Sequence, residues 1–365
     1  MTITHIRLDA DNGLLDYIAT LFTTASKTVV ITGAGISQDF RSRTGAFSKA
    51  LGAPTNRRKA ARDARWGRDM FQSSVLRHEG QSAAFYSYMT RLHQSIKRAR
   101  PTETHLFLRA LRDAGILVRE YTQNIDTLSE QAGLLAGMSP IDADLEKRGK
   151  RERRDRRPHC VPLHGSLHYL RCTLCSRRHS WDNGNHELKT MDGYAPDCPD
   201  CADASVRRVR KGKRPITVGR LRPDIVLYGE ADSRTADIIS MVQHDRSLKP
   251  RLLLILGTSL STHGVKSLVR DFARTVHDSG GVVVMVNRTQ PASSTWDRFI
   301  NYWVEWDCDA WVRDLMLRQS FPSKATELVR PGHAADEPAI DENGSGGSNG
   351  AILGSREWPI DLTSD

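Results

Sequence analysis

Four of the six cysteines form two C-x2-C pairs, Cys172 with Cys175 and Cys198 with Cys201. Each C-x2-C turn presents two thiolates to one metal ion, and two such turns complete the tetrahedral shell that zinc prefers. Because all four ligands come from the protein, no position stays open for water, and the pattern predicts one structural zinc. The alternative, two disulfides, requires an oxidising compartment. Residues 1–5 lack the features of a signal peptide, so we expect an intracellular chain with reduced thiols.

Apolar runs that suit buried strands flank the cysteine region on both sides. Strands are predicted at 28–32, 116–121, 160–163, 225–228, 252–256 and 282–286, and helical spacing occurs at 12–25, 82–98, 103–114 and 265–276. Strands that alternate with helices imply parallel pairing with right-handed crossovers. We therefore predict an α/β fold, a doubly wound parallel Rossmann-like sheet with a smaller inserted zinc-ribbon and helical domain.

This pattern divides the chain into segments. The Rossmann-like domain is expected to comprise 12–49, 101–164 and 215–320, with a helical insert at 50–100, a zinc-ribbon insert at 165–214, a basic insertion loop at 139–158 and a disordered acidic tail at 331–365. The tail contains a Gly/Ser-rich run that cannot form a packed core. No apolar run is long enough to span a membrane.

Charge is distributed unevenly along the chain. The net charge is +10, but residues 331–365 carry −6, so residues 1–330 carry +16. The basic run at 146–157 is long and poor in apolar residues, which suits a nuclear import signal or non-specific contact with DNA or nucleosomes. For the second basic run, 207–214, we expect a solvated loop.

Several short motifs are weak when taken singly. The glycine pair of Gly33-Ala34-Gly35 after a strand is often just a tight turn, although it also lets backbone N–H groups approach phosphates. His164 alone is compatible with a core histidine in a turn. Their order and spacing, however, resemble the sirtuins, the NAD-dependent protein-lysine deacylases, over residues 12–320. The motifs that carry this resemblance are Gly33–Ser37, Asp39–Ser42, Thr122–Asp126, Leu163–Gly165, the four cysteines, Gly219–Glu230, Gly257–Leu260 and Val286–Arg288.

The resemblance implies a role for each of these motifs. It implies a catalytic group of His164, Asn124 and Asp126. The implied NAD contacts are Gly33, Ala34, Gly35, Ile36, Asp39, Phe40, Arg41, Gln123, Ile125, Gly257, Thr258, Ser259, Asn287 and Cys308. The implied protein-substrate contacts are Val226, Leu227, Tyr228, Gly229, Glu230, Gly264 and Val265. Residues 225–228 then form an open strand edge that accepts the substrate peptide by strand addition.

The resemblance also implies an enzymatic function, that of an NAD-dependent protein-lysine deacetylase. Such an enzyme consumes NAD as a co-substrate and releases nicotinamide and 2′-O-acetyl-ADP-ribose, with His164 as general base. The motifs are most like the fungal nuclear branch, which implies an acetylated histone as partner and a nuclear location, with a cytoplasmic location as the alternative. Two other functions remain open: a catalytically weakened NAD- and chromatin-binding protein, and a mono-ADP-ribosyltransferase that uses the same site.

The chain departs from the family pattern at two places. Only Gln38 separates Ser37 from Asp39, where the family has a longer stretch, so we expect a tighter loop that alters the position of residues 39–41. Thr127 follows Asp126 where glycine is usual. Because a β-branched residue does not easily adopt positive φ, we expect the turn there to differ.

Overall fold

The computed structural model describes residues 2–7, 11–24, 27–37, 70–137, 157–230 and 234–318. Its central element is a seven-stranded sheet in which every pair of neighbouring strands is parallel. In spatial order the strands are β1 (Thr4–Ile6), β10 (Tyr302–Val304), β9 (Val282–Val286), β8 (Leu252–Leu256), β2 (Thr28–Thr32), β3 (Leu117–Thr122) and β4 (Cys160–Pro162). The predicted doubly wound parallel sheet is confirmed.

The direction of winding reverses between β2 and β8. From β2 the chain proceeds outward through β3 and β4, and then returns to the other side of β2 through β8, β9 and β10. In open α/β sheets, ligands bind outside the carboxyl ends of the strands at such a switch point. Here the switch point lies between the turn that begins at Gly33 and the turn that begins at Gly257.

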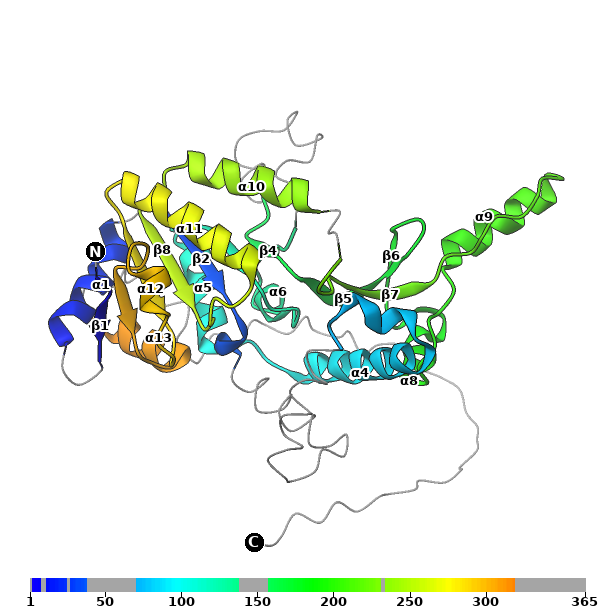
Figure 1. Cartoon of the computed structure of the whole chain (residues 1–365), viewed down its shortest axis with the longest axis horizontal. Helices are drawn as coiled ribbons and strands as arrows, with labels where there is room; N and C mark the ends of the chain where they lie inside the picture. Colours follow the sequence, from blue (N-terminus) through cyan, green and yellow to red (C-terminus); the bar gives the residue numbers. More distant parts are fainter. Residues whose placement is uncertain are drawn as a thin grey trace, which may run out of the picture. The chain divides into compact units, whose positions relative to one another are not determined.

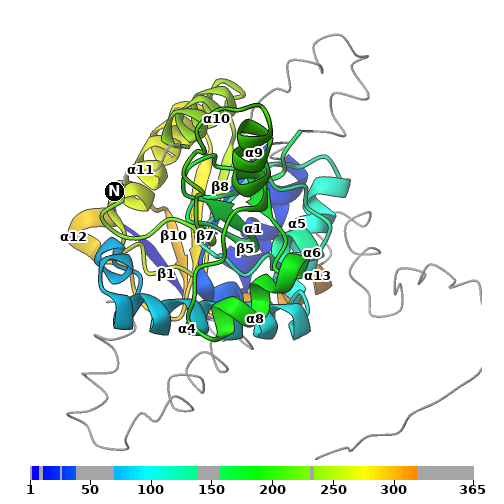
Figure 2. The ribbon, with the colours of Figure 1, turned by 90° about the vertical axis from the view of Figure 1, so that its right-hand side faces the viewer.

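The central strands are apolar on both faces because helices cover both sides of the sheet (Figures 1 and 2). Alternate strand residues enter two separate cores. One core lies against α1 (Asn12–Thr24), α5 (Glu103–Asp113) and α13 (Cys308–Leu317), and the other against α10 (Thr235–Ser247) and α11 (His263–Asp278). The remaining short elements of this region are α6 (Leu128–Gln131), α12 (Ser293–Trp296) and the 3-10 turn η1 (Ala34–Ile36).

A second, three-stranded sheet belongs to the zinc-binding part of the chain. Strand β5 (Gly165–Cys172) pairs antiparallel with both β6 (Arg178–His179) and β7 (Leu221–Ile225). A third core joins this sheet to helix α4 (Glu79–Arg98). The other elements here are η2 (Ser73–Arg77), η4 (Asn183–Asn185), α8 (His186–Met191) and α9 (Pro199–Arg210).

Two expectations about this region were wrong. The segment 225–228 does not return to the main sheet, because β7 ends at Ile225 and pairs with β5, so the small sheet draws strands from both sides of the cysteines. The basic run 207–214 is not a loop throughout, since α9 continues to Arg210. The proposed domain boundaries remain a prediction. Residues 39–41, residues 50–69 of the predicted helical insert, residues 139–156 of the predicted basic insertion and the 331–365 tail lie outside the described residues.

A buried ion pair connects β3 to α10. The guanidinium of Arg119 contacts both carboxylate oxygens of Asp245 at 2.6 and 3.1 Å, and the hydroxyl of Tyr121 donates to the same carboxylate at 2.7 Å. Both charged side chains are almost completely buried. Burial and the neighbouring carboxylate raise the pKa of Tyr121, so its hydroxyl remains a donor. Among the described helices, none is long and apolar enough to cross a membrane.

Loss of one partner of this buried pair is expected to destabilise the fold strongly. Asp245→Ala leaves the Arg119 charge buried without a counterion, and the free energy of unfolding should fall by about 3–5 kcal/mol. The measurement is urea-induced unfolding. The control is Asp271→Ala, which removes an exposed ion pair with Arg274 and should cost about 1 kcal/mol or less. Equal losses for the two variants would contradict the prediction.

Candidate active site and metal centre

The turns after β2 and β8 approach each other so closely that only glycine fits. The N–H of Gly35 donates to the carbonyl of Gly257 at 2.7 Å. A Cβ on Gly35 would lie 2.5 Å from the Gly257 Cα, and a Cβ on Gly33 would lie 2.7 Å from the Thr258 Cβ. The glycine pair is therefore required by packing at the switch point, where backbone groups at the start of a helical turn suit phosphate binding.

The segment after β3 adds polar side chains to the same edge of the sheet. The amide of Gln123 donates to the Thr258 hydroxyl at 2.8 Å, and the amide of Asn124 donates to the Gly33 carbonyl at 3.2 Å. Asp126 is buried and accepts hydrogen bonds from the Ser37 hydroxyl at 2.9 Å and from the Leu128 N–H at 3.1 Å. These contacts hold the three side chains in defined orientations.

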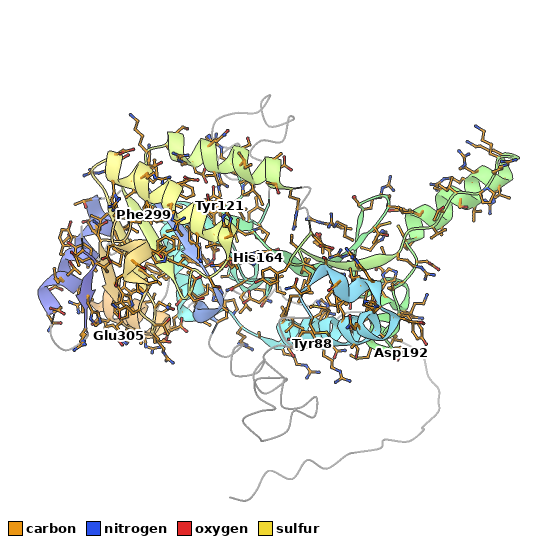
Figure 3. All side chains as sticks on the ribbon, in the orientation of Figure 1. Tyr88, Tyr121, His164, Asp192, Phe299 and Glu305 are labelled. Atoms are coloured by element: carbon orange, nitrogen blue, oxygen red, sulfur yellow. The ribbon has the colours of Figure 1, made fainter. Side chains whose placement is uncertain are left out.

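His164 lies where the chain leaves the main sheet for the small sheet (Figure 3). Its Nδ1 lies 3.0 Å from the Gln123 carbonyl, which can only accept, so Nδ1 carries the proton and the neutral ring has its lone pair on Nε2. The next residue, Gly165, has φ +82, and a Cβ there would lie 2.3 Å from the Asp224 carbonyl oxygen. The His-Gly sequence is thus required by the turn as well as suited to proton transfer.

A cavity of about 910 Å³ brings most of the expected groups together. It is lined by Ala34, Gln123, Asn124, Ile125, Asp126 and His164, and by the expected substrate contacts Val226, Leu227, Tyr228, Gly229, Glu230, Gly264 and Val265. Ile225, from the predicted substrate edge, also lines it, whereas sequence reasoning missed the lining residues Phe71, Tyr88, Leu92, Thr262 and His263. Tyr88 and Leu92 lie in α4 and Phe71 precedes that helix, and no sequence motif singles out any of the three.

The remaining expected cofactor contacts lie beside the cavity, at the same edge of the sheet. Gly33, Gly35, Ile36, Gly257, Thr258 and Ser259 belong to the two turns at the switch point, Asn287 follows β9, and Cys308 begins α13. The Cys308 thiol is buried near the Val286 carbonyl at 3.7 Å, and burial raises its pKa above its usual range. Asp39, Phe40 and Arg41 lie outside the described residues.

Two expectations about the site need correction. Thr127 does adopt positive φ, 58°, so the turn keeps the left-handed conformation and the threonine bears the strain. The expected open strand edge at 225–228 is not observed, because β7 ends at Ile225 and the backbone N–H and C=O of Tyr228 bond to Phe71 and Ser73 at 2.7 and 2.9 Å. The N–H of Leu227 donates to the Glu230 carboxylate at 3.1 Å, which closes the segment into a turn.

The four cysteines converge on one point, as their spacing predicts. The Sγ atoms of Cys172 and Cys201 lie 3.8 Å apart and those of Cys175 and Cys198 lie 3.7 Å apart, and all four lie within 4.8 Å of one another. Thiolates around a tetrahedral zinc are separated by about 3.8 Å, whereas a disulfide requires about 2.05 Å. The donor set therefore fits a structural zinc.

Zinc loading should depend on these four thiols and on no other cysteine among the described residues. Cys198→Ser is expected to lower the zinc content of the purified protein from about one per chain to near zero and to loosen the small sheet, because Cys198 lies in the third core. The measurement is metal analysis with circular dichroism. Cys308→Ser is the matched control, since Cys308 is equally buried but remote from the cluster, and it should retain its zinc.

A buried histidine, His105, is linked through Thr102 to the turn of Gly33–Ser37. His105, near the start of α5, accepts at Nδ1 from the Thr102 N–H at 3.2 Å, while the Thr102 hydroxyl donates to the Ile36 carbonyl at 2.9 Å. Burial lowers the pKa of His105 to about 4, an effect that the nearby Asp126 carboxylate only partly opposes. His105 is therefore neutral in the folded protein at physiological pH.

The burial of His105 predicts acid sensitivity. In the unfolded chain a histidine titrates near 6.5, so between pH 6.5 and 4 the unfolded state binds more protons than the folded state. Stability should therefore be unaffected by this group above pH 6.5 and should fall by up to about 3 kcal/mol as the pH drops to 4. Urea unfolding measured at several pH values tests this. His105→Gln, which cannot titrate, should show a shallower decline; an identical decline would contradict the assignment.

Comparison with known proteins identifies the family. The Sir2 family model matches residues 30–139 and 141–264. The chain belongs to the Sir2 family. It is 36% identical over 325 residues to "NAD-dependent histone deacetylase HST3" of Candida albicans, covering 86% of this chain and 64% of that protein. It is 35% identical over 328 residues to the Saccharomyces cerevisiae protein of the same name, covering 84% and 68%.

Solved structures agree with the Sir2 fold. "Structure of Sir2Tm bound to a propionylated peptide" superposes with a TM-score of 0.56 at 21% identity, covering 84% of this chain and 97% of that one. "Sir2-p53 peptide-NAD+" gives a TM-score of 0.56 at 21% identity, covering 82% and 96%. At this identity the likeness shows the fold alone. The chain spans about two thirds of the length of its relatives named HST3.

Proposed function

We propose that this Sir2-family chain is an NAD-dependent protein-lysine deacetylase that acts on acetylated histones in the nucleus. The observation that carries the proposal is the single cavity in which the glycine turn, the Gln123–Asp126 segment and His164 meet the predicted substrate residues. The names of the two HST3 relatives supply the histone substrate and the use of NAD. Nuclear location follows from that substrate.

The residues at the switch point fit a dinucleotide. Gly33 and Gly35 let the turn after β2 pack directly on the turn after β8, and the N–H groups of η1 begin a helical turn at this edge of the sheet. Bound NAD would supply an electrophilic ribose carbon with nicotinamide as leaving group. Ser259 is exposed beside these turns, and Cys308 and Asn287 extend the same edge toward β9 and α13. In this proposal they serve the adenosine side.

His164 is proposed as the general base. The Gln123 carbonyl holds its Nδ1–H, which directs basicity to Nε2 at the cavity. Nε2 would accept the proton from a ribose hydroxyl, and imidazole suits this because its titration near neutrality makes transfer efficient in both directions. The Gln123 contact acts as the orienting bond that a catalytic imidazole requires.

Asn124 and Asp126 are proposed to orient the ribose and the nicotinamide amide. Asp126 is available for this role because the Ser37 hydroxyl and the Leu128 N–H keep its carboxylate in place at the cavity wall. Asn124 is held by Gly33, so its position depends on the phosphate-binding turn. A nucleotide that orders this turn would thereby also order the polar end of the cavity.

The opposite side of the cavity suits the aliphatic part of an acetyl-lysine. Phe71, Tyr88, Leu92, Leu227 and Val265 form an apolar lining that leads to His164. An acetylated lysine is uncharged and carries four methylenes, so it loses little on leaving water. A charged lysine would be rejected by the same lining. Contact of the 146–157 basic run with DNA remains a prediction, since residues 146–156 lie outside the described part of the chain.

The proposal is tested by nicotinamide release. Zinc-loaded protein with NAD and an acetylated histone peptide should release nicotinamide only when the peptide is acetylated, and His164→Ala should lower the rate by about 10²- to 10⁴-fold. His168→Ala is the matched control, since His168 is exposed on the neighbouring β5 and does not line the cavity. It should leave the rate unchanged.

Other outcomes would favour the alternatives. Tight NAD binding by a folded, zinc-replete chain without acetyl-dependent release would favour a binding protein that has lost activity. Transfer of label from NAD to protein in place of deacetylation would favour a mono-ADP-ribosyltransferase. Equal rates in the His164 and His168 variants would remove His164 from the chemistry.

A further inference from the structure

The helix that carries zinc ligand Cys201 continues far beyond the metal site. Cys198 precedes α9 as its N-cap, Cys201 lies in its first turn, and the helix then runs on to Arg210. Figures 1 and 3 show α9 projecting away from the small sheet. Every residue from 206 to 217 is exposed. We call residues 206–217 the basic arm.

Packing does not explain why the basic arm exists. A helix in a globular protein is normally stabilised by an apolar face that packs on a core. In α9 only Cys201 is buried, while Val206 and Val209 are 48% and 54% exposed. The arm therefore contributes nothing to the third core, and its retention as an ordered helix requires another explanation.

The arm nevertheless has a defined structure, because the chain folds back along the helix after Gly212. The N–H of Lys213 donates to the Arg208 carbonyl at 3.0 Å, and the N–H of Ile216 donates to the Ser205 hydroxyl at 3.2 Å. The Arg208 guanidinium donates to the Arg214 carbonyl at 3.1 Å. These bonds bring the cations of the last helical turn and of the returning segment to the same tip.

Six cations gather on the arm without a compensating acid. They are Arg207, Arg208, Arg210, Lys211, Lys213 and Arg214. None of them forms an ion pair with a carboxylate of the described residues, and the acids of α9, Asp200 and Asp203, lie toward its other end. The negative end of the helix dipole offsets only part of this charge. Like charges so close together repel one another unless an external polyanion neutralises them.

We propose that the basic arm binds duplex DNA through its phosphate backbone. Arginine and lysine on phosphates give affinity without sequence choice, and six cations at one exposed tip can contact several neighbouring phosphates. An acidic protein surface fits less well, because protein interfaces rely on aromatic and apolar anchors and residues 199–217 contain no aromatic side chain. This binding is independent of NAD and of His164.

The zinc centre gives the arm its orientation. Because Cys198 and Cys201 are both at the start of α9, the metal fixes the helix to the turn that carries Cys172 and Cys175. A structural metal would then serve a binding surface as well as the small sheet. The sequence predicted a solvated basic loop at 207–214. In the proposal this segment is instead the tip of an oriented helix that binds phosphates.

The test compares two triple variants of the full-length chain that lose the same charge. The arm variant carries Arg207→Gln, Arg208→Gln and Arg210→Gln, which preserve helix propensity. The control variant carries Lys189→Gln, Arg251→Gln and Arg298→Gln at exposed sites away from the arm. Binding to a short labelled duplex of arbitrary sequence is measured by fluorescence anisotropy over a series of salt concentrations, with melting temperature and zinc content as checks of folding.

The arm variant should bind DNA roughly tenfold or more weakly, with a salt slope lower by about 0.9 for each phosphate contact removed. The control variant should bind nearly as the unaltered chain does. Equal weakening in both variants, or none in the arm variant, would overturn the proposal. So would displacement of the DNA by poly-glutamate at equal charge concentration, which would assign the arm to acidic proteins. Nicotinamide release from a free acetylated peptide should be unchanged in the arm variant, so this test and that of the deacetylase fail separately.

Discussion

The site depends on the contact between two backbone turns, one after β2 and one after β8. The N–H of Gly35 donates to the Gly257 carbonyl at 2.7 Å, and neither glycine has space for a Cβ. The contact is possible because β2 and β8 are adjacent parallel strands whose carboxyl ends lie at one level. Asn124 and Gln123 then bond to these turns, and His164 bonds to Gln123. The orientations of Gln123, Asn124 and His164 thus follow from the two glycine turns.

Two unusual residues show how strain and burial are concentrated around these turns. Thr127 accepts a left-handed conformation directly after Asp126, and His105 is held neutral beneath the glycine turn by burial that lowers its pKa to about 4. Strained backbone and buried ionisable groups persist where the surrounding structure determines them, which is common at functional sites. Thr127 follows Asp126 directly in the chain, and His105 bonds to Thr102, whose hydroxyl donates to the Ile36 carbonyl.

The zinc-binding part of the chain has two consequences for the rest of the molecule. Its small sheet includes β5, which begins directly after His164, so the metal-stabilised unit also positions the proposed base. It also directs α9 outward with its cations unpaired. A module that contains no catalytic residue thereby has a part in both the proposed chemistry and the proposed DNA contact.

The sequence by itself determined the elements whose residue types indicate burial or metal binding directly. The runs at 28–32, 252–256 and 282–286 are apolar throughout because both faces are buried, and the C-x2-C pairs predict their metal because four thiolates fill its coordination shell. The short strands β1 and β10 and the helices α10 and α13 were not predicted. Three residues at a sheet edge carry too weak a period, and α10 buries only Met241 and Asp245.

Only the tertiary structure decided which distant residues share the cavity and which backbone groups remain available. In the sequence, Phe71, Tyr88 and Leu92 are ordinary apolar positions. They line the cavity because α4 packs on the small sheet. The segment 225–228 reads as a strand of the main sheet, yet its pairing goes to β5 and to residues 71–73. Local composition specifies whether a residue is buried and how its backbone bends. Its partners depend on long-range packing, which no short stretch of sequence contains.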